Sequence, residues 1–179
     1  PSPATIATYK NDLSGNAYRK MADRLLASKG YGEQQARYWL DVVHFGETHG
    51  FDKDKRRDDA YLYKHWVISA FNADLPVETF VLHQLAGDVI APADRNAVIA
   101  TGFLAAGPWD FVGQVELPEG VVEKAKTRNL DRDDILTSTM QTFTGLSVQC
   151  ARCHDHKFDP IPQRDYYALQ AVFAGIERA

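Results

Sequence analysis

The residues best suited to cofactor chemistry lie in one short stretch. Cys150, Cys153 and His154 form the pattern C-x-x-C-H, which is the spacing of covalent c-type haem attachment. In that chemistry two thiols add across the two vinyl groups of one porphyrin, and the neighbouring imidazole reaches the iron. On a helix, positions i, i+3 and i+4 share one face, so all three side chains can address one flat cofactor. The chain has no other cysteine. We therefore predict one covalent haem c, with His154 as the proximal iron ligand.

Two other chemistries use paired cysteines at this spacing. A redox-active dithiol of the thioredoxin type would lie at a helix N-terminus directly after a strand, whereas a long helical pattern precedes this motif. A zinc site of two cysteines and two histidines needs further histidines at finger spacing, and none follows. Haem c is favoured, and a metal site or a bare dithiol are the alternatives.

The composition is that of an ordinary globular chain. It has 179 residues, 45% of them hydrophobic, and a net charge of -4, which argues against a nucleic-acid surface. No apolar stretch approaches the ~20 residues needed to cross a bilayer. Because haem c is normally attached outside the cytoplasm, we expect a periplasmic or otherwise extracytoplasmic protein. The chain shows no signal peptide, so we expect that a signal was removed or that the chain is a piece of a longer secreted protein.

Apolar residues recur at three- and four-residue steps along most of the sequence, and no strand pattern of useful length appears. Residues 1–179 are therefore predicted to form a single all-α domain of about seven to eight helices packed around one c-type haem. Pro162 is expected to end an extended segment before the last helix. The expected helical segments, of which 3–9 and 121–129 are short, cover about residues 3–9, 17–28, 32–45, 61–71, 77–86, 94–103, 121–129, 131–150 and 163–173.

The second axial ligand is predicted to be His49, with His44 as the alternative. Met140 lies about 15 Å before the motif by the helical rise, and Met21 falls in the middle of an apolar stripe. His49 follows the end of a helix, and Gly50 lets the backbone approach a flat ligand. The simpler interpretation is that His49 is an exposed loop histidine.

Two further segments have a structural and a functional interpretation. Arg56 and Arg57 belong to a charged run that is typical of a solvated turn, but their guanidinium groups could also bind the haem propionates. The irregular segment 107–120 contains Trp109 and Phe111. It is either a connecting loop or the wall of a ligand site.

Several segments resemble, in order and over nearly the whole chain, the planctomycete cytochrome-associated domain of unknown function. The resemblance implies a piece of a longer secreted protein in which a second uncharacterised domain follows, but it implies no particular activity. Where the family has acidic residues this chain has His65 and His83, so neither is a candidate for a shared ligand. The matching segments are Tyr31-Gly-Glu, Trp39-Leu-Asp41, Glu47-Thr-His-Gly50, Trp66-Val-Ile-Ser-Ala-Phe-Asn72, Gln84-Leu-Ala-Gly-Asp88, Ala100-Thr-Gly-Phe103 and residues 150–161.

These observations predict a c-type cytochrome domain that transfers single electrons in an extracytoplasmic redox chain. Its partner would be a redox protein or another domain of the parent chain. A haem enzyme with an open distal site, using Arg37, Tyr38 or His44 as polar groups, is the alternative. A third class is a haem-dependent structural module. Whether the protein is an enzyme is left undecided by the sequence.

Overall fold

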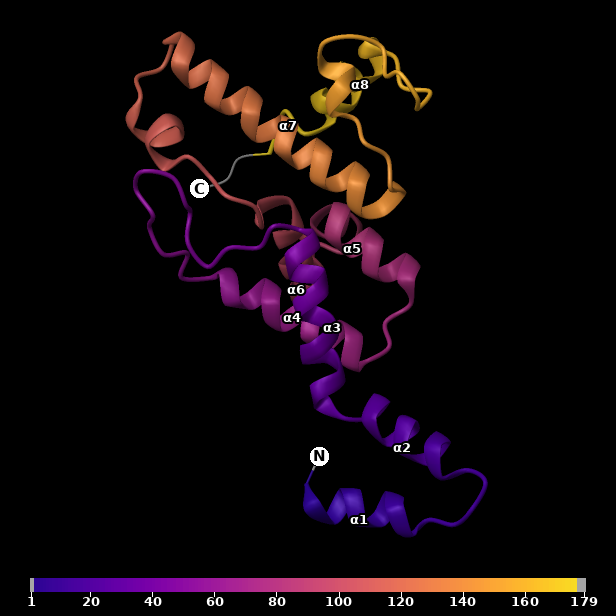
Figure 1. Cartoon of the computed structure of the whole chain (residues 1–179). Helices are drawn as coiled ribbons and strands as arrows, with labels where there is room; N and C mark the ends of the chain where they lie inside the picture. The colour runs from indigo at the N-terminus through magenta and orange to yellow at the C-terminus, as the bar shows by residue number, and fades with distance from the viewer. Residues whose placement is uncertain (1, 177–179) are drawn as a thin grey trace.

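The computed structural model describes residues 2–176 and is built from α-helices joined by turns and by longer loops, such as the one between α3 and α4 (Figure 1). Over these residues no β-strand is present, and the only sheet-like pairing is an isolated antiparallel bridge between Thr48 and Arg56. The predicted all-α class is confirmed. The elements are α1 Pro3–Asn11, α2 Ala17–Leu26, α3 Lys29–Val42, α4 Ala60–Asn72, α5 Val77–Ile90, α6 Arg95–Ala100, η1 Thr101–Ala105, η2 Val112–Glu116, α7 Val122–Thr144, η3 Gln149–Arg152 and α8 Gln163–Val172.

Local signals explain several helix starts. The Ser2 hydroxyl accepts a hydrogen bond from the Thr5 amide at the start of α1, and the Asp94 carboxylate accepts one from the Asn96 amide at the start of α6. Both side chains satisfy amides that lack a partner within the helix. The expected start of a helix at about residue 94 is therefore confirmed, and Asp94 is its N-terminal cap.

The longest helix, α7, departs from the prediction. The sequence suggested a short helix over 121–129 and a second one running into Cys150, but α7 is continuous from Val122 to Thr144. It ends at Gly145, whose φ of 70° is in the left-handed region, where glycine has no steric cost. The C-x-x-C-H motif therefore lies beyond the helix rather than at its end.

A second difference concerns Gly87, which was expected to stop the helix that precedes it. The helix α5 instead continues to Ile90 through a kink at Ala86, where φ is -151°. Gly87 has a packing role, because a Cβ atom there would lie 2.0 Å from the carbonyl oxygen of Ala97 in α6. Only glycine allows α5 and α6 to approach this closely.

The larger core cluster lies between α3, α4, α5 and η1 and is mainly aromatic. Trp66 stacks on Phe80, with ring centroids 5.2 Å apart, and Trp39 meets Phe80 edge to face at 4.8 Å. The fully buried Gln84 side chain satisfies the polar edges of this cluster. Its Oε1 atom accepts hydrogen bonds from Trp39 Nε1 at 3.0 Å and from Tyr63 Oη at 2.7 Å.

A second core cluster fills the space between α7 and α8. It consists of Leu136, Val148, Ala151, Ile161 and Tyr166, all buried. In the described residues the chain's own side chains fill both cores, and Cys150 and Cys153 are exposed beside the smaller one. The expected packing of the helices around a haem stays a prediction.

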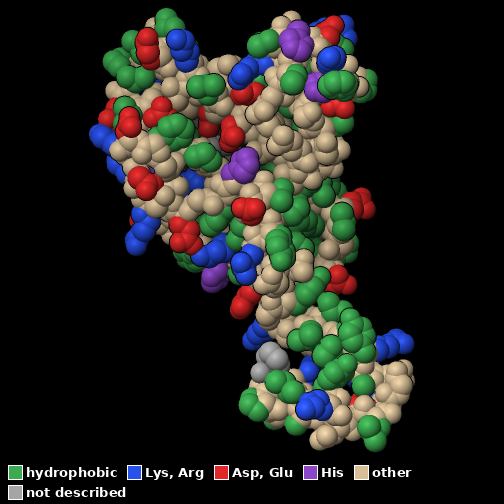
Figure 2. All heavy atoms as spheres, in the orientation of Figure 1, with side chains coloured by type: hydrophobic (Ala, Val, Ile, Leu, Met, Phe, Trp, Pro, Cys, Tyr) green, Lys and Arg blue, Asp and Glu red, His purple; other side chains and the backbone are tan. Residues whose placement is uncertain are grey.

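The first two helices form an arm that projects from the rest of the molecule (Figure 1). None of the residues of α1 or α2 is buried, and Leu13 between them is 96% exposed. Hydrophobic side chains gather on this arm (Figure 2).

Candidate functional site

The two cysteines lie on a turn of 3-10 helix that follows α7. Cys150 belongs to η3, and the amide of Cys153 donates a hydrogen bond to the carbonyl oxygen of Cys150 at 3.3 Å. A 3-10 helix has three residues per turn, so residues i and i+3 lie on the same side. Both thiols are free and exposed. The structure thus brings the two sulfur atoms to one solvent-facing side of a single turn.

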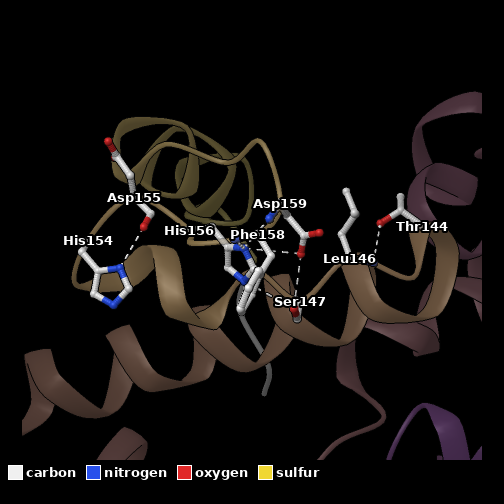
Figure 3. Close-up of polar contacts among 8 residues, drawn as sticks. All are labelled: Thr144, Leu146, Ser147, His154, Asp155, His156, Phe158 and Asp159. Carbon is white, nitrogen blue, oxygen red and sulfur yellow. Dashed lines mark hydrogen bonds and ion pairs between the residues drawn. The ribbon is translucent and has the colours of Figure 1, made fainter.

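His154 has the hydrogen bond expected of a metal-binding histidine. Its Nδ1 atom lies 2.8 Å from the carbonyl oxygen of Asp155, and its ring points away from the neighbouring His156 (Figure 3). Because a carbonyl oxygen only accepts, Nδ1 carries the hydrogen and Nε2 keeps its lone pair. A backbone partner on the other ring nitrogen is the usual arrangement for histidine ligands.

A buried polar network fixes the motif to both flanking helices. Asp133 of α7 is 7% exposed, and its two oxygens accept hydrogen bonds from Tyr166 Oη of α8 at 2.5 Å and from Arg152 Nη1 at 2.7 Å. The Asp133 charge raises the pKa of Arg152. Burial, followed by the contact with Asp133, raises the pKa of Tyr166. Arg152 stands between the two cysteines, so this network determines where the thiols lie.

The residues that follow the motif form a tight turn whose polar groups are used internally. The His156 Nδ1 atom accepts hydrogen bonds from the amides of Asp159 at 2.7 Å and Phe158 at 3.3 Å (Figure 3). Nδ1 therefore has no hydrogen to donate to the Asp159 carboxylate 3.5 Å away, and that contact is not an ion pair. The backbone therefore supplies the partners of the His156 Nδ1 atom.

Asp155 stabilises the next helix. Its Oδ1 atom accepts a hydrogen bond from the amide of Gln163 at 2.7 Å, and Gln163 is the first residue of α8. The first amides of a helix have no partner within the helix. The motif is therefore held at its start by Asp133 and at its end by the N-terminus of α8.

The other predicted site residues line a large, half-open pocket elsewhere in the molecule. Its volume is about 1140 Å³, and its described lining includes His49, Arg56 and Arg57 but none of Cys150, Cys153 and His154. Figure 1 shows the loop between α3 and α4 well separated from the end of α7 and the turn that follows it. The structure therefore divides the predicted site residues into two groups, and the role of His49 as an axial ligand stays a prediction.

His49 is held in this pocket by backbone and aromatic contacts. Its amide donates to the Lys55 carbonyl at 2.9 Å, and its own carbonyl accepts from the Trp109 amide at 2.8 Å. The imidazole stacks on Phe111, with ring centroids 5.9 Å apart, and meets Trp109 edge to face at 5.0 Å. Desolvation, and then the positive charges of Arg57 and Lys55, lower the pKa of His49.

The segment 107–120 is therefore more than a connection. Trp109, which is 6% exposed, lines the pocket together with Phe111 and Gln114. Of the two interpretations of this segment, the wall of a cavity matches the structure. Trp109 and Phe111 were the sequence signal for this wall, whereas the contact between His49 and Trp109 had no signal in the local sequence.

The two arginines predicted to bind propionates have partners within the chain. Arg57 donates to the carbonyl oxygens of Ala105, Ala106 and Gly46 at 2.6, 2.9 and 3.3 Å. It thereby joins the α3–α4 loop to η1. Arg56 pairs with Asp58 at 2.7 Å on the surface. A role in binding propionates stays a prediction for both.

His44, the alternative axial ligand, is exposed and lies just after α3 with a φ of 54°. It is not in the described lining of the pocket.

Among residues 2–176, no group of three or more His, Cys, Asp or Glu side chains is arranged to hold a metal ion. No helix in that range is long and apolar enough to cross a membrane.

These features define a class: an all-helical domain whose C-x-x-C-H motif forms an exposed turn between its last two helices. The chain belongs to the family described as PSCyt2, a protein of unknown function (DUF1549), whose model matches residues 1–178. No curated protein and no solved structure matches this chain. The resemblance to a domain of unknown function is thereby confirmed, and the family brings no activity with it.

Proposed function

We propose that this chain is a haem c attachment domain, with Cys150 and Cys153 as the thioether residues and His154 as the proximal iron ligand. The observation that supports it most is the turn itself. Two free thiols lie exposed on one side of it, beside a histidine whose Nδ1 is already bonded to the Asp155 carbonyl. In attachment, each thiol adds across one vinyl group: a carbon–sulfur bond forms, and the thiol hydrogen moves to the other vinyl carbon.

A bound haem would supply one-electron chemistry at the iron. The chain's own residues would then orient it. Arg152 and Asp133 hold the turn in place, and the His154 ring is directed outward by Asp155. Because both cysteines are exposed, a haem attached to them would be accessible to a redox partner. We therefore propose electron transfer in an extracytoplasmic redox chain, to a partner protein or to another part of a longer chain.

A haem enzyme with an open distal site is the second candidate. It is favoured because neither of two histidines is placed to be a second axial ligand. His156 Nδ1 accepts hydrogen bonds from backbone amides, and His49 lines the separate pocket. The spectrum of the ferric protein distinguishes the two functions, because two strong axial ligands give a low-spin iron and an open site gives a high-spin one. If His49 moves to the iron, His49→Ala should convert a low-spin spectrum to a high-spin one, whereas an unchanged spectrum would exclude His49.

The attachment itself is tested by producing the protein together with cytochrome c maturation machinery. The pigment should stay on the protein through acid–acetone extraction, and a Cys150→Ala/Cys153→Ala variant should carry none. Because both thiols are exposed, the variant should keep its helical circular dichroism. That result would separate loss of attachment from loss of fold. A colourless wild-type protein, or a pigment that extracts freely, would contradict the proposal.

A further inference from the structure

The pocket beside His49 is large enough for a small-molecule ligand and has no assigned role. Its volume of about 1140 Å³ is slightly above the usual range of small-molecule sites, roughly 300–1,000 Å³. It is formed by the α3–α4 loop, the start of α4, the segment 107–120, α6, η1, one face of α7 and the residues after α8. No residue of the C-x-x-C-H motif belongs to its described lining, so its function can be considered separately from haem.

One wall of the pocket is apolar. Ile99 of α6 and Ala105 of η1 line it together with Phe45. Trp109 and Phe111 are in the lining as well, but the Phe111 ring already stacks on His49 and has Lys55 Nζ 3.4 Å from its centroid. Phe111 is therefore engaged within the chain, and the apolar wall consists of two aliphatic side chains and one aromatic ring.

The charged groups of the lining are four arginines and three aspartates. Two of the arginines are already paired with carboxylates: Arg128 makes two hydrogen bonds to Glu119, at 2.8 and 2.9 Å, and Arg56 is paired with Asp58. Arg57 is held by three carbonyl oxygens.

Arg132 is the exception among these arginines. It is partly buried, and across residues 2–176 it makes no hydrogen bond or ion pair. Its guanidinium group is not fully withdrawn from water, so its donors are available to a ligand in the pocket. Their planar arrangement matches a carboxylate. An anion in the pocket can therefore form an ion pair with Arg132 without displacing a partner within the described residues.

The acidic residues of the lining do not neutralise the charge of Arg132. Asp58 is paired with Arg56, Asp131 already has an interaction partner, and Asp59 is exposed to water. A second polar group in the pocket is also unused. The Nδ1 atom of His49 is buried and has no hydrogen-bond partner among the described residues.

We propose that this pocket binds a small organic oxyanion, with a carboxylate as the best match, through an ion pair with Arg132. The ligand's apolar part would lie along Ile99 and Ala105, and its anionic group would lie at the end of the pocket formed by α7. The site does not depend on haem: it would be present in the protein with or without the cofactor.

The test uses 2-naphthoate as the probe and its uncharged isostere 2-naphthamide as the matched ligand, with isothermal titration calorimetry. Arg132→Gln removes the charge and keeps the length of the side chain, and Arg132→Lys keeps the charge without the planar fork. Arg19→Gln is the control, because Arg19 is exposed on the projecting arm. Thermal unfolding of each variant shows that it is folded.

The wild-type protein and Arg19→Gln should bind naphthoate equally and bind naphthamide at least tenfold more weakly. Arg132→Gln should weaken naphthoate binding by tenfold or more, with Arg132→Lys in between. The nuclear magnetic resonance signals of the His49 ring should shift on binding naphthoate. The proposal is overturned if naphthoate does not bind at millimolar concentration, if naphthamide binds as well, or if Arg132→Gln binds like Arg19→Gln. Equal affinity for inorganic sulfate would overturn the part of the proposal that gives the apolar wall a role.

Discussion

The buried carboxylate of Asp133 gives the most direct test of how the motif is held. Asparagine has the same shape as aspartate but no charge, and one of its two terminal atoms donates rather than accepts. In Asp133→Asn, either Tyr166 or Arg152 must therefore face an NH₂ group in place of a carboxylate oxygen. Tyr166 is fully buried, so it cannot turn to water for a replacement partner.

The size of the effect follows from the two hydrogen bonds. A bond to a charged group contributes about 1.5–3 kcal/mol, and this is the value for the buried bond from Tyr166. The Arg152 side chain is 43% exposed, so its ion pair is screened and adds no more than ~1 kcal/mol. We expect Asp133→Asn to reduce the free energy of unfolding by about 2–3 kcal/mol. At this chain length that corresponds to roughly 5–10 °C in the thermal midpoint.

The measurement is chemical and thermal unfolding followed by circular dichroism, with Asp23→Asn as the control. Asp23 is exposed in α2 and has only a long contact of 3.9 Å with Arg19, so the same change there should cost less than 0.5 kcal/mol or so. A double-mutant cycle with Tyr166→Phe isolates the buried bond. Equal stability of Asp133→Asn and Asp23→Asn, or no coupling to Tyr166, would refute the role given to this network.

Two further predictions concern the packing of α5 and the loop that carries His49. Gly87→Ala should destabilise the protein by about 1–3 kcal/mol in thermal unfolding, because the new Cβ would meet the Ala97 carbonyl. The control is Gly15→Ala, which should be close to neutral because no atom lies within 4 Å of the position of its Cβ. Desolvation and the positive charges of Arg57 and Lys55 outweigh Asp54 and lower the pKa of His49 below 6.5. Below pH 6.5 the unfolded chain therefore binds more protons than the folded one. The free energy of unfolding should fall as the pH is lowered below 6.5. His49→Gln should remove that part of the pH dependence, and a His49 pKa at or above its ordinary value by nuclear magnetic resonance would contradict the electrostatic argument.

The helical periodicity was sufficient to predict the all-α class, and short-range signals such as Asp94 were sufficient to predict where a helix begins. The end of α7 was predicted wrongly because Leu146 and Cys150 continue the apolar spacing beyond Thr144. The left-handed conformation of Gly145 interrupts the helix before those residues. Glycine is a common residue at the end of a helix, so Gly145 could have been taken as a stop signal. The apolar spacing argued against a stop there, because Leu146 continues it. In the structure Leu146 packs against the second core cluster without belonging to the helix.

The burial of Asp133 could not be predicted in the same way. In the sequence it belongs to an acidic group that is favourable near a helix N-terminus, whereas in the structure it lies in the middle of α7. Its partners Arg152 and Tyr166 are 19 and 33 residues away, and only the packing of α8 against α7 brings them together. The pocket is non-local for the same reason, since His49 and Trp109 become neighbours only through the tertiary fold.

The two candidate sites are arranged on different faces of one helix. Arg128 and Arg132 are four residues apart on α7 and therefore share the face that lines the pocket. Asp133 and Leu136 share another face, which contacts the C-x-x-C-H turn and α8. Arg132 and Asp133 are neighbours in the sequence, yet their side chains serve different sites. For this reason loss of anion binding in Arg132→Gln would say nothing against haem attachment. A colourless protein, in turn, would leave the pocket proposal intact.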